Sequence, residues 1–169
     1  MSYFYTPPLH IIDRPADARH TSGTRRAVDI WYIVLHATVG GLQSSLNWLT
    51  TDPRSNVSTH RLIDQNGDIY KICDDLTIAN HVGYSRMGNK SPNPNALGIE
   101  FVNSNSGRDP YETAQLASGV NQVVEWLALY GALPILSHWQ IDTKYKSDPA
   151  GFPWNQFYRM LYARLGQLL

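Results

Sequence analysis

Apolar runs separated by turn signals predict that strands and helices follow one another along this chain. The segment 31–36 is an almost uninterrupted apolar run that ends in a histidine. Such a run predicts a strand that is covered on both faces. The short run 134–137, which also precedes a histidine, predicts a second buried strand, and residues 97–103 predict a third.

A β-hairpin is predicted between residues 58 and 73. The apolar-alternating segments 58–64 and 69–73 flank an Asn66-Gly67 pair. Asn-Gly between two such segments is the strongest short signal for a hairpin, because both residues tolerate the positive φ angles of the tight turn.

Three segments carry apolar residues at helical spacing and predict helices. The first spans about 42–50 and the last about 154–168. The longest opens at Asp109, which predicts the N-cap, and Glu112 is expected to complete a capping box. Gly131 is expected to end this helix.

Two polar segments are predicted to be irregular. Arg14 to Arg26 is basic in places and reads as a loop or arm before the first core strand. Residues 80–95 are rich in Gly, Pro and Asn, and loops of that length tend to carry function. The whole pattern predicts one α/β domain with a central mixed β-sheet flanked by helices, in which 1–29 forms an N-terminal arm and 30–169 the main part.

Composition narrows the class of protein. The chain has 169 residues, of which 43% are hydrophobic, so it can bury a sizeable core. Its formal net charge of +0 argues against binding to nucleic acid by bulk charge. No apolar stretch approaches the ~18 residues that would insert into a membrane. Cys73 is the only cysteine, which excludes an intrachain disulfide, and residues 1–10 lack a secretory signal, so we expect synthesis in the cytoplasm.

A candidate metal site follows from the two histidines at strand ends. A single histidine there is more often a structural residue than a ligand. His36 and His138 both precede loops, however, and Asp148 follows the second histidine within a Lys-Ser-Asp-Pro element. Two imidazoles and one carboxylate form a plausible three-ligand Zn²⁺ site, which leaves a fourth position for water, as in catalytic zinc sites. This pattern favours a metal-assisted hydrolase.

Two further residues could take part in the chemistry. Lys146 lies two positions before Asp148, so both side chains project to the same side of an extended segment. It could donate to a developing oxyanion, or it could be an ordinary surface lysine. Glu100 lies inside an apolar strand, where it is either a general base facing a polar site or an edge-strand glutamate facing solvent.

The other histidines receive weaker assignments. His60 is expected to support the site or contact the substrate rather than bind metal, and His81 is expected to line a groove. His10 and His20 carry no motif and are expected on the surface.

The ordered set of motifs resembles the type 2 N-acetylmuramoyl-L-alanine amidase family, which includes phage lysozymes, cytoplasmic muropeptide-recycling amidases and peptidoglycan recognition proteins. The resemblance covers roughly residues 30–150. Its motifs are Val34-Leu35-His36-Ala37-Thr38, Val57-Ser58-Thr59-His60, Asp64-Gln65-Asn66-Gly67, Ala79-Asn80-His81-Val82-Gly83, Gly98-Ile99-Glu100-Phe101, Ser137-His138 and Lys146-Ser147-Asp148-Pro149.

The resemblance implies a mixed sheet with Zn²⁺ held in a surface groove by His36, His138 and Asp148. It implies cleavage of the amide between N-acetylmuramic acid and L-alanine of peptidoglycan, with Glu100 and Lys146 as the catalytic residues. The residues expected to contact the substrate are His60, His81 and Thr38.

Two departures within the family place the chain more closely. Asp148 stands where the phage lysozymes of the family have a cysteine ligand, and Thr59 stands where they have a tyrosine. The resemblance therefore implies the Glu100 and Lys146 mechanism of the recycling type rather than one that uses a tyrosine.

Several readings of the function remain open at the level of sequence. A phage or prophage endolysin, released by a holin-type route, is favoured over a cytoplasmic recycling amidase, because the chain ends without the extra C-terminal features expected of a dedicated recycler. The other readings are a non-catalytic peptidoglycan-binding module and a zinc peptidase. A monomer is expected. The Arg14 to Arg26 segment could be a cationic contact to the wall, but a solvated loop is favoured.

Overall fold

The structure is a computed structural model that describes residues 10–83 and 91–168. The strands are β1 (Ile11–Asp13), β2 (Thr21–Thr24), β3 (Tyr32–Ala37), β4 (Arg61–Ile63), β5 (Ile69–Lys71), β6 (Thr77–Ala79), β7 (Ala96–Phe101) and β8 (Ile135–Ser137). The α-helices are α1 (Leu42–Thr50), α2 (Thr113–Tyr130), α3 (His138–Ile141) and α4 (Trp154–Gly166), and short 3₁₀ turns lie at η1 (Ala18–His20), η2 (Ala27–Asp29) and η3 (Asn93–Asn95).

The six strands of the central sheet lie in the order β1-β5-β4-β7-β3-β8. β3 pairs in parallel with β7 and β8, whereas β4 and β5 pair antiparallel across the Asn66-Gly67 turn. The predictions of a mixed sheet and of the hairpin are thereby confirmed. β8 is an edge strand in which Ile135 and Leu136 are half-buried, so the prediction of a buried strand was wrong for these two residues.

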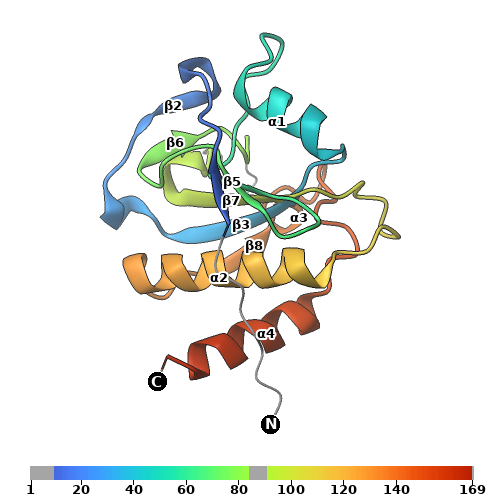
Figure 1. Ribbon diagram of the computed structural model, residues 1–169. Helices are drawn as coiled ribbons and strands as arrows, with labels where there is room; N and C mark the ends of the chain where they lie inside the picture. Colours follow the sequence, from blue (N-terminus) through green and yellow to red (C-terminus); the bar gives the residue numbers. More distant parts are fainter. Residues whose placement is uncertain (1–9, 84–90, 169) are drawn as a thin grey trace.

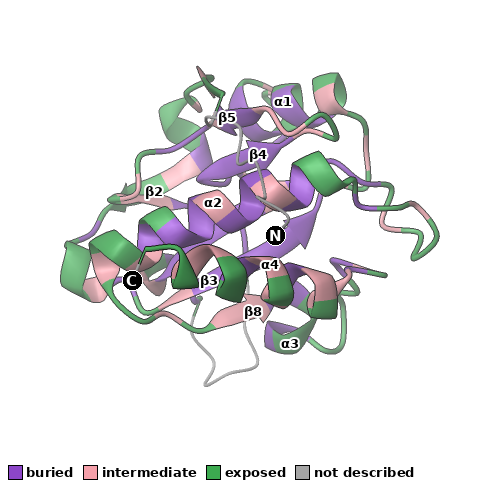
Figure 2. Ribbon diagram, turned by 60° about the horizontal axis from the view of Figure 1, so that its bottom comes forward, coloured by how far each residue is buried: buried purple, intermediate pink, exposed green. Residues whose placement is uncertain are grey.

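Helices cover both faces of the sheet (Figure 1). α2 lies along one face, and α4 packs against α2. α1 packs on the other face, where Leu46 joins the cluster around Leu62. The next residue, Ile63, belongs to the cluster beneath α2, so neighbouring residues of one strand serve opposite faces. Figure 2 shows the buried residues concentrated in the sheet and the inner side of α2. Among the described residues, no helix is long and apolar enough to cross a membrane.

Gly119 allows α2 to lie close to the sheet. A Cβ atom at this position would be 2.7 Å from Cζ of the fully buried Phe101.

Replacement of Gly119 by alanine is expected to lower the free energy of unfolding by about 1–3 kcal/mol, because the core has no room for the methyl group. Urea unfolding measures the change. Gly166→Ala in α4 is the matched control, since a Cβ there meets nothing within 4 Å. Equal stability of the two variants would contradict this account.

The long helix begins later than its sequence predicts. Its first residue is Thr113 and its N-cap is Glu112, which makes no side-chain cap, so the predicted capping box was wrong. The carboxylate of Asp109 instead accepts a hydrogen bond of 2.7 Å from the backbone nitrogen of Ser104. Asp109 therefore stabilises the preceding turn, an alternative that short acidic side chains offer to helix capping. The predicted end at Gly131 is confirmed.

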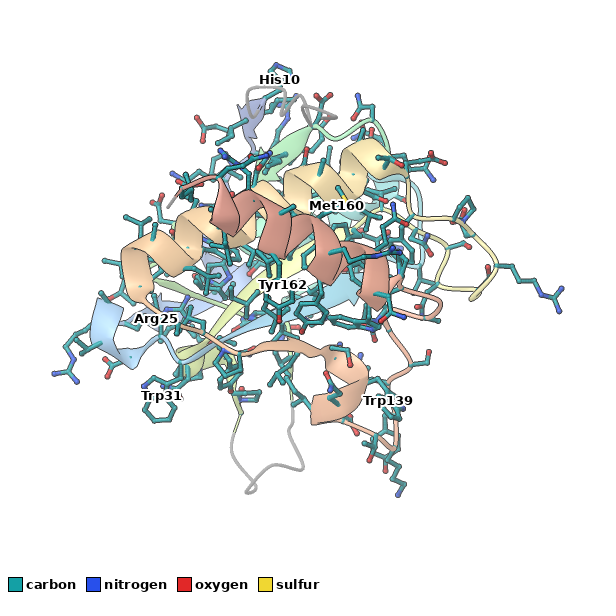
Figure 3. The ribbon with its side chains drawn as sticks, turned by 90° about the horizontal axis from the view of Figure 1, so that it is seen from below. His10, Arg25, Trp31, Trp139, Met160 and Tyr162 are labelled. Carbon is teal, nitrogen blue, oxygen red and sulfur yellow. The ribbon has the colours of Figure 1, made fainter. Side chains whose placement is uncertain are left out.

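The segment from Arg14 to Arg26 contains the short strand β2, so the prediction of a loop was wrong for residues 21–24. This strand pairs antiparallel with β6, and β1 precedes the segment in the central sheet. His20, expected on the surface, is fully buried, with Nδ1 2.7 Å from the carbonyl oxygen of Val57. His10 is exposed, as expected (Figure 3).

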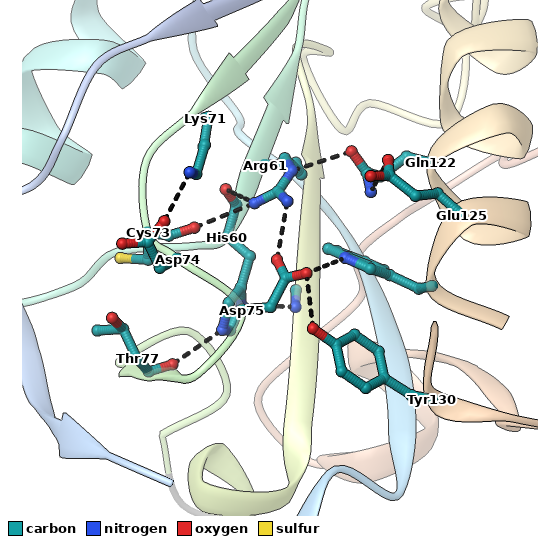
Figure 4. A network of polar contacts seen from close by, with 12 residues as sticks. His60, Arg61, Lys71, Cys73, Asp74, Asp75, Thr77, Gln122, Glu125 and Tyr130 are labelled. Carbon is teal, nitrogen blue, oxygen red and sulfur yellow. Dashed lines mark hydrogen bonds and ion pairs between the residues drawn. The ribbon is translucent and has the colours of Figure 1, made fainter. Parts of the chain in front are cut away.

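Arg25 ties this segment to a network of buried and half-buried charges, part of which, around Arg61 and Asp75, is shown in Figure 4. The Asp75 carboxylate accepts hydrogen bonds from Arg61 Nη2 (2.8 Å), Trp126 Nε1 (3.0 Å) and the Tyr130 hydroxyl (3.0 Å). The guanidinium group of Arg25 donates hydrogen bonds to the backbone carbonyl oxygen of Asp75 at 2.7 Å and to that of Ala96, the first residue of β7, at 2.6 Å. Because the buried guanidinium groups of Arg25 and Arg61 are hydrogen-bonded and lie near the Asp75 carboxylate, their charges can be tolerated in the interior.

Candidate functional site

The sheet places His36 and Glu100 side by side. His36 lies near the end of β3, and its register partner on β7 is Glu100. The preceding residues of both strands, Leu35 and Ile99, belong to the core beneath α2. Side chains alternate along a strand, so His36 and Glu100 project from the opposite face. β7 lies between β4 and β3, which excludes the edge-strand reading of Glu100.

A short capped turn presents the second histidine. His138 is the first residue of α3, directly after β8. Ser137 and Gln140 form a capping box, in which Gln140 N donates to Ser137 Oγ at 3.1 Å and Ser137 N donates to Gln140 Oε1 at 2.7 Å. The backbone nitrogen of Trp139, an exposed residue of α3 (Figure 3), donates to the carbonyl oxygen of Asp148 at 3.0 Å. This bond joins the Asp148 segment to the histidine turn.

The three predicted ligands converge. His36 Nδ1 and His138 Nδ1 are 3.0 Å apart. Oδ2 of Asp148 lies 3.2 Å from the first nitrogen and 3.0 Å from the second. All three residues are buried, and among the described residues they form a group able to hold a metal ion.

The donor set fits a metal ion. Two ligands of a tetrahedral Zn²⁺ with bonds of about 2.0–2.1 Å lie about 3.3 Å apart, close to the separations among His36, His138 and Asp148. Both histidines present Nδ1, and their other nitrogens are engaged: His36 Nε2 lies 2.9 Å from His81 Nδ1, and His138 Nε2 lies 3.1 Å from the Val82 carbonyl oxygen. Such contacts commonly orient metal-binding imidazoles.

The protonation states also suit metal binding. Burial and the neighbouring His138 lower the pKa of His36 to about 4, so its imidazole is neutral at neutral pH. Burial alone would raise the pKa of Asp148, but the imidazoles of His138 and His36 hold this pKa well below its ordinary value. Neutral imidazole and ionised carboxylate are the forms that bind a cation.

Glu100 is the titratable group beside this cluster. The residue is only partly buried, but its Oε2 atom is closed off from solvent and has no hydrogen-bond partner among the described residues. Burial and the negative charge of Asp148 raise the pKa of Glu100 to about 8, against the opposing effect of Lys146. A carboxyl group with a pKa near neutrality can both accept and return a proton during a reaction.

These groups face an open cavity of about 470 Å³. Lys146 and His81 line it, together with Thr38, whose hydroxyl donates to the Gly40 carbonyl oxygen at 2.7 Å. Glu100 and the candidate ligands His138 and Asp148 also line it, whereas the third candidate ligand, His36, is 1% exposed and does not. The lining residues from α1 are Ser44, Ser45, Trp48 and Leu49.

Sequence reasoning missed two residues at the rim. Trp48 is 44% exposed and lies off the Leu42, Leu46 and Leu49 stripe of α1. A tryptophan on the polar side of an amphipathic helix is the signal that could have identified it. Val39 is 66% exposed and has φ of 66°, which is unusual for a β-branched residue and has no signature in the sequence.

His60 lies away from this cavity, contrary to the expectation that it contacts the substrate. It is fully buried, its Nδ1 accepts a hydrogen bond of 2.9 Å from Gly98 N, and its Nε2 lies 2.8 Å from Arg25 Nη2. Both ring nitrogens are therefore engaged by protein groups. This geometry makes His60 a structural residue between β4, β7 and the N-terminal segment.

Comparison with known proteins gives a family match. A family model described as N-acetylmuramoyl-L-alanine amidase matches residues 26–151. That range contains the three candidate metal ligands, Glu100 and Lys146. No match was found among curated protein sequences.

Solved structures share the fold. A selenomethionine derivative of AmpD is 21% identical, with a TM-score of 0.76 over 93% of this chain and 96% of that chain. AmiD from E. coli, in complex with the substrate anhydro-N-acetylmuramic acid-L-Ala-D-γ-Glu-L-Lys, is 27% identical, with a TM-score of 0.69 over 78% of this chain and 57% of that chain. The endolysin amidase LysCS from Clostridium intestinale URNW is 18% identical, with a TM-score of 0.69 over 94% of this chain and 97% of that chain.

Proposed function

The chain belongs to the N-acetylmuramoyl-L-alanine amidase family, and we propose that His36, His138 and Asp148 hold the Zn²⁺ with which it hydrolyses its substrate. It is an amidase that acts on peptidoglycan or muropeptides. The observation that carries the assignment of the site is the convergence of two Nδ1 atoms and one carboxylate oxygen beside Glu100, whose Oε2 atom is closed off from solvent. Two nitrogen donors and one oxygen donor suit Zn²⁺. Metal analysis of the purified protein tests the ion, and stoichiometric zinc is the expected result.

The residues of the cavity support a hydrolytic mechanism. When bound, Zn²⁺ polarises the carbonyl group and acidifies the attacking water. Glu100 accepts the proton of this water as the new C–O bond forms at the lactyl carbonyl carbon. Lys146 donates a hydrogen bond to the oxygen that gains negative charge. Glu100 then returns the proton to the alanine nitrogen as the C–N bond breaks, which yields a carboxylic acid and a free amine.

The role of Lys146 predicts a double effect of its removal. Lys146→Ala is expected to lower kcat by about 10²–10³, because one oxyanion donor is lost. It is also expected to move the ascending limb of the pH profile to higher pH, since Lys146 lowers the pKa of Glu100 and the ionised base is the active form. Steady-state kinetics from pH 5 to 10, with zinc content as the control, measure both. Near-normal turnover with an unshifted limb would remove Lys146 from the mechanism.

For the biological role we propose an endolysin that degrades the polymeric wall and acts as a monomer. Val39 and Trp48 leave the rim of the cavity exposed, which gives a glycan chain room to continue past the reacting bond. A muropeptide-recycling amidase would break the same bond in a small soluble substrate. Lysis of outer-membrane-stripped cells, compared with turnover of soluble anhydro-muropeptide, separates the two roles. Faster turnover of the soluble substrate, without lysis, would favour recycling.

The products identify the bond that is cleaved. An amidase exposes the amino group of L-alanine and leaves the glycan intact, whereas a zinc peptidase cuts within the stem peptide. Mass spectrometry of digested peptidoglycan distinguishes these outcomes. Products cut between amino acids would contradict the proposed function.

A further inference from the structure

One short loop contacts both candidate metal-binding histidines on their far sides. His81 and Val82 are consecutive residues of this loop, between β6 and the cavity. The His81 ring meets His36 Nε2 at 2.9 Å, and the Val82 carbonyl oxygen meets His138 Nε2 at 3.1 Å. The two imidazoles come from different elements, β3 and α3, so this loop is a contact that they share.

The backbone of the loop is itself held by a buried side chain. Oδ1 of Asn93 accepts hydrogen bonds from the backbone nitrogens of His81 (3.2 Å) and Val82 (2.9 Å). Asn93 is 7% exposed, and its backbone carbonyl oxygen accepts a hydrogen bond of 3.1 Å from the guanidinium group of the buried Arg25. Since both loop groups are donors, the side-chain amide must present its oxygen to them.

We propose that Asn93 is a positioning residue for the metal site, which it supports by fixing the loop that orients His36 and His138. This proposal rests on the proposed zinc site. A carbonyl oxygen can only accept, so the Val82 contact favours the tautomer in which His138 Nε2 carries the proton and the Nδ1 lone pair is offered to the metal. If His81 Nδ1 accepts a hydrogen bond from His36 Nε2, the Nδ1 lone pair of His36 is likewise left for the metal. Asn93 contributes no atom to the cavity and touches neither ligand.

The packing of His81 makes its position sensitive to the backbone. Its ring lies against Gly98 of β7, where an added Cβ would be 2.7 Å from His81 Nδ1. A methyl group at position 98 would therefore push the ring away from His36. Gly98→Ala offers a second way to disturb the same contact, without removing a hydrogen-bonding side chain.

The test is the affinity of the metal-free protein for Zn²⁺, measured by competition with a chelator. Loss of a residue that supports metal ligands typically weakens metal binding by about 10–100-fold, and Asn93→Ala is expected to fall in this range. Asn93→Asp, which keeps the acceptor oxygen, is expected to bind Zn²⁺ nearly as tightly as the wild type. Asn95→Ala is the matched control in the same turn, because Asn95 Nδ2 donates to the Asp29 carbonyl oxygen at 2.7 Å and does not contact the loop.

Wild-type affinity in a folded Asn93→Ala protein would overturn the proposal. Equal losses in Asn93→Ala and Asn95→Ala would also overturn it, since they would indicate general loosening of the turn. If Asn93→Ala does not fold, two other measurements test the proposal. Gly98→Ala is expected to bind Zn²⁺ more weakly than the wild type, because it displaces the His81 ring, and ¹⁵N NMR of the wild-type histidine side chains shows which ring nitrogens carry protons. The zinc-loaded wild-type protein should show His138 protonated on Nε2, because in the metal-free protein the Asp148 carboxylate, 3.0 Å from His138 Nδ1, competes for the ring proton. An unprotonated Nε2 in the zinc-loaded protein would refute the proposal. Because these readouts need no substrate, a failure of the amidase assignment would be seen separately.

Discussion

Replacement of Asp148 by alanine is expected to give a folded protein that loses its metal on dialysis and has no measurable amidase activity. Asp148 contributes the oxygen that lies 3.0–3.2 Å from both ligand nitrogens. Without it two imidazoles remain, one fewer than the three protein ligands of a catalytic zinc site. The fold should survive, because the two main hydrophobic clusters are formed by the strands with α1, α2 and α4.

Zinc content after dialysis, activity on peptidoglycan and thermal unfolding together test this expectation. Asp148→Cys is the matched rescue variant, because a thiolate is also a good zinc ligand. It should regain zinc, even if activity returns only in part. Stoichiometric zinc and wild-type activity in Asp148→Ala would contradict the assignment of Asp148 as a metal ligand. His60 could not then replace Asp148 without a rearrangement, since its ring nitrogens contact Gly98 and Arg25.

The two histidines among the candidate metal ligands could be predicted because each follows an apolar run that marks a strand, whereas Asp148 was found from the Lys-Ser-Asp-Pro element. The apolar run before His36 and the turn after Leu136 both place a histidine at the same edge of a parallel sheet. Glu100 was recognisable as a carboxylate within an apolar strand. The direction in which the Glu100 side chain points could not be predicted, because it depends on the order of strands and on the register with β3. Sheet order is a non-local property that no segment of the sequence carries alone.

The failures share this cause. Residues 14–26 have the composition of a loop, yet β2 forms there because β6 offers a partner. Arg25 is a charged residue that is buried because main-chain carbonyls and His60 surround it. Likewise, the role proposed for Asn93 depends on a loop 11 and 12 positions earlier in the chain. Composition indicates how a segment behaves in water, whereas the burial and pairing of these residues depend on the groups that the fold places next to them.

Glu100→Gln is expected to retain zinc and to lose about 10²–10⁴-fold in kcat, the usual contribution of general acid-base catalysis. Glutamine has nearly the same shape as glutamate, but it cannot accept the proton of the attacking water. Glu100 does not belong to the metal-binding group, so metal content should not change. The ascending limb of the pH profile, which reflects ionisation of this carboxyl group, should disappear with it. This limb is expected below pH 8, because a bound cation lowers the pKa of about 8 that burial and Asp148 give Glu100 in the metal-free site.

Glu125→Gln is the matched control, because Glu125 lies on α2 and accepts a hydrogen bond of 3.1 Å from Gln122, on the other side of the sheet from the cavity. Its kcat and pH profile should equal those of the wild type. Retention of more than about a tenth of kcat in Glu100→Gln would exclude Glu100 as the general base, because such a loss is far below the range for this kind of catalysis. Loss of zinc in Glu100→Gln would instead mean that the carboxylate supports the metal, and a defect in catalysis could then not be assigned to proton transfer.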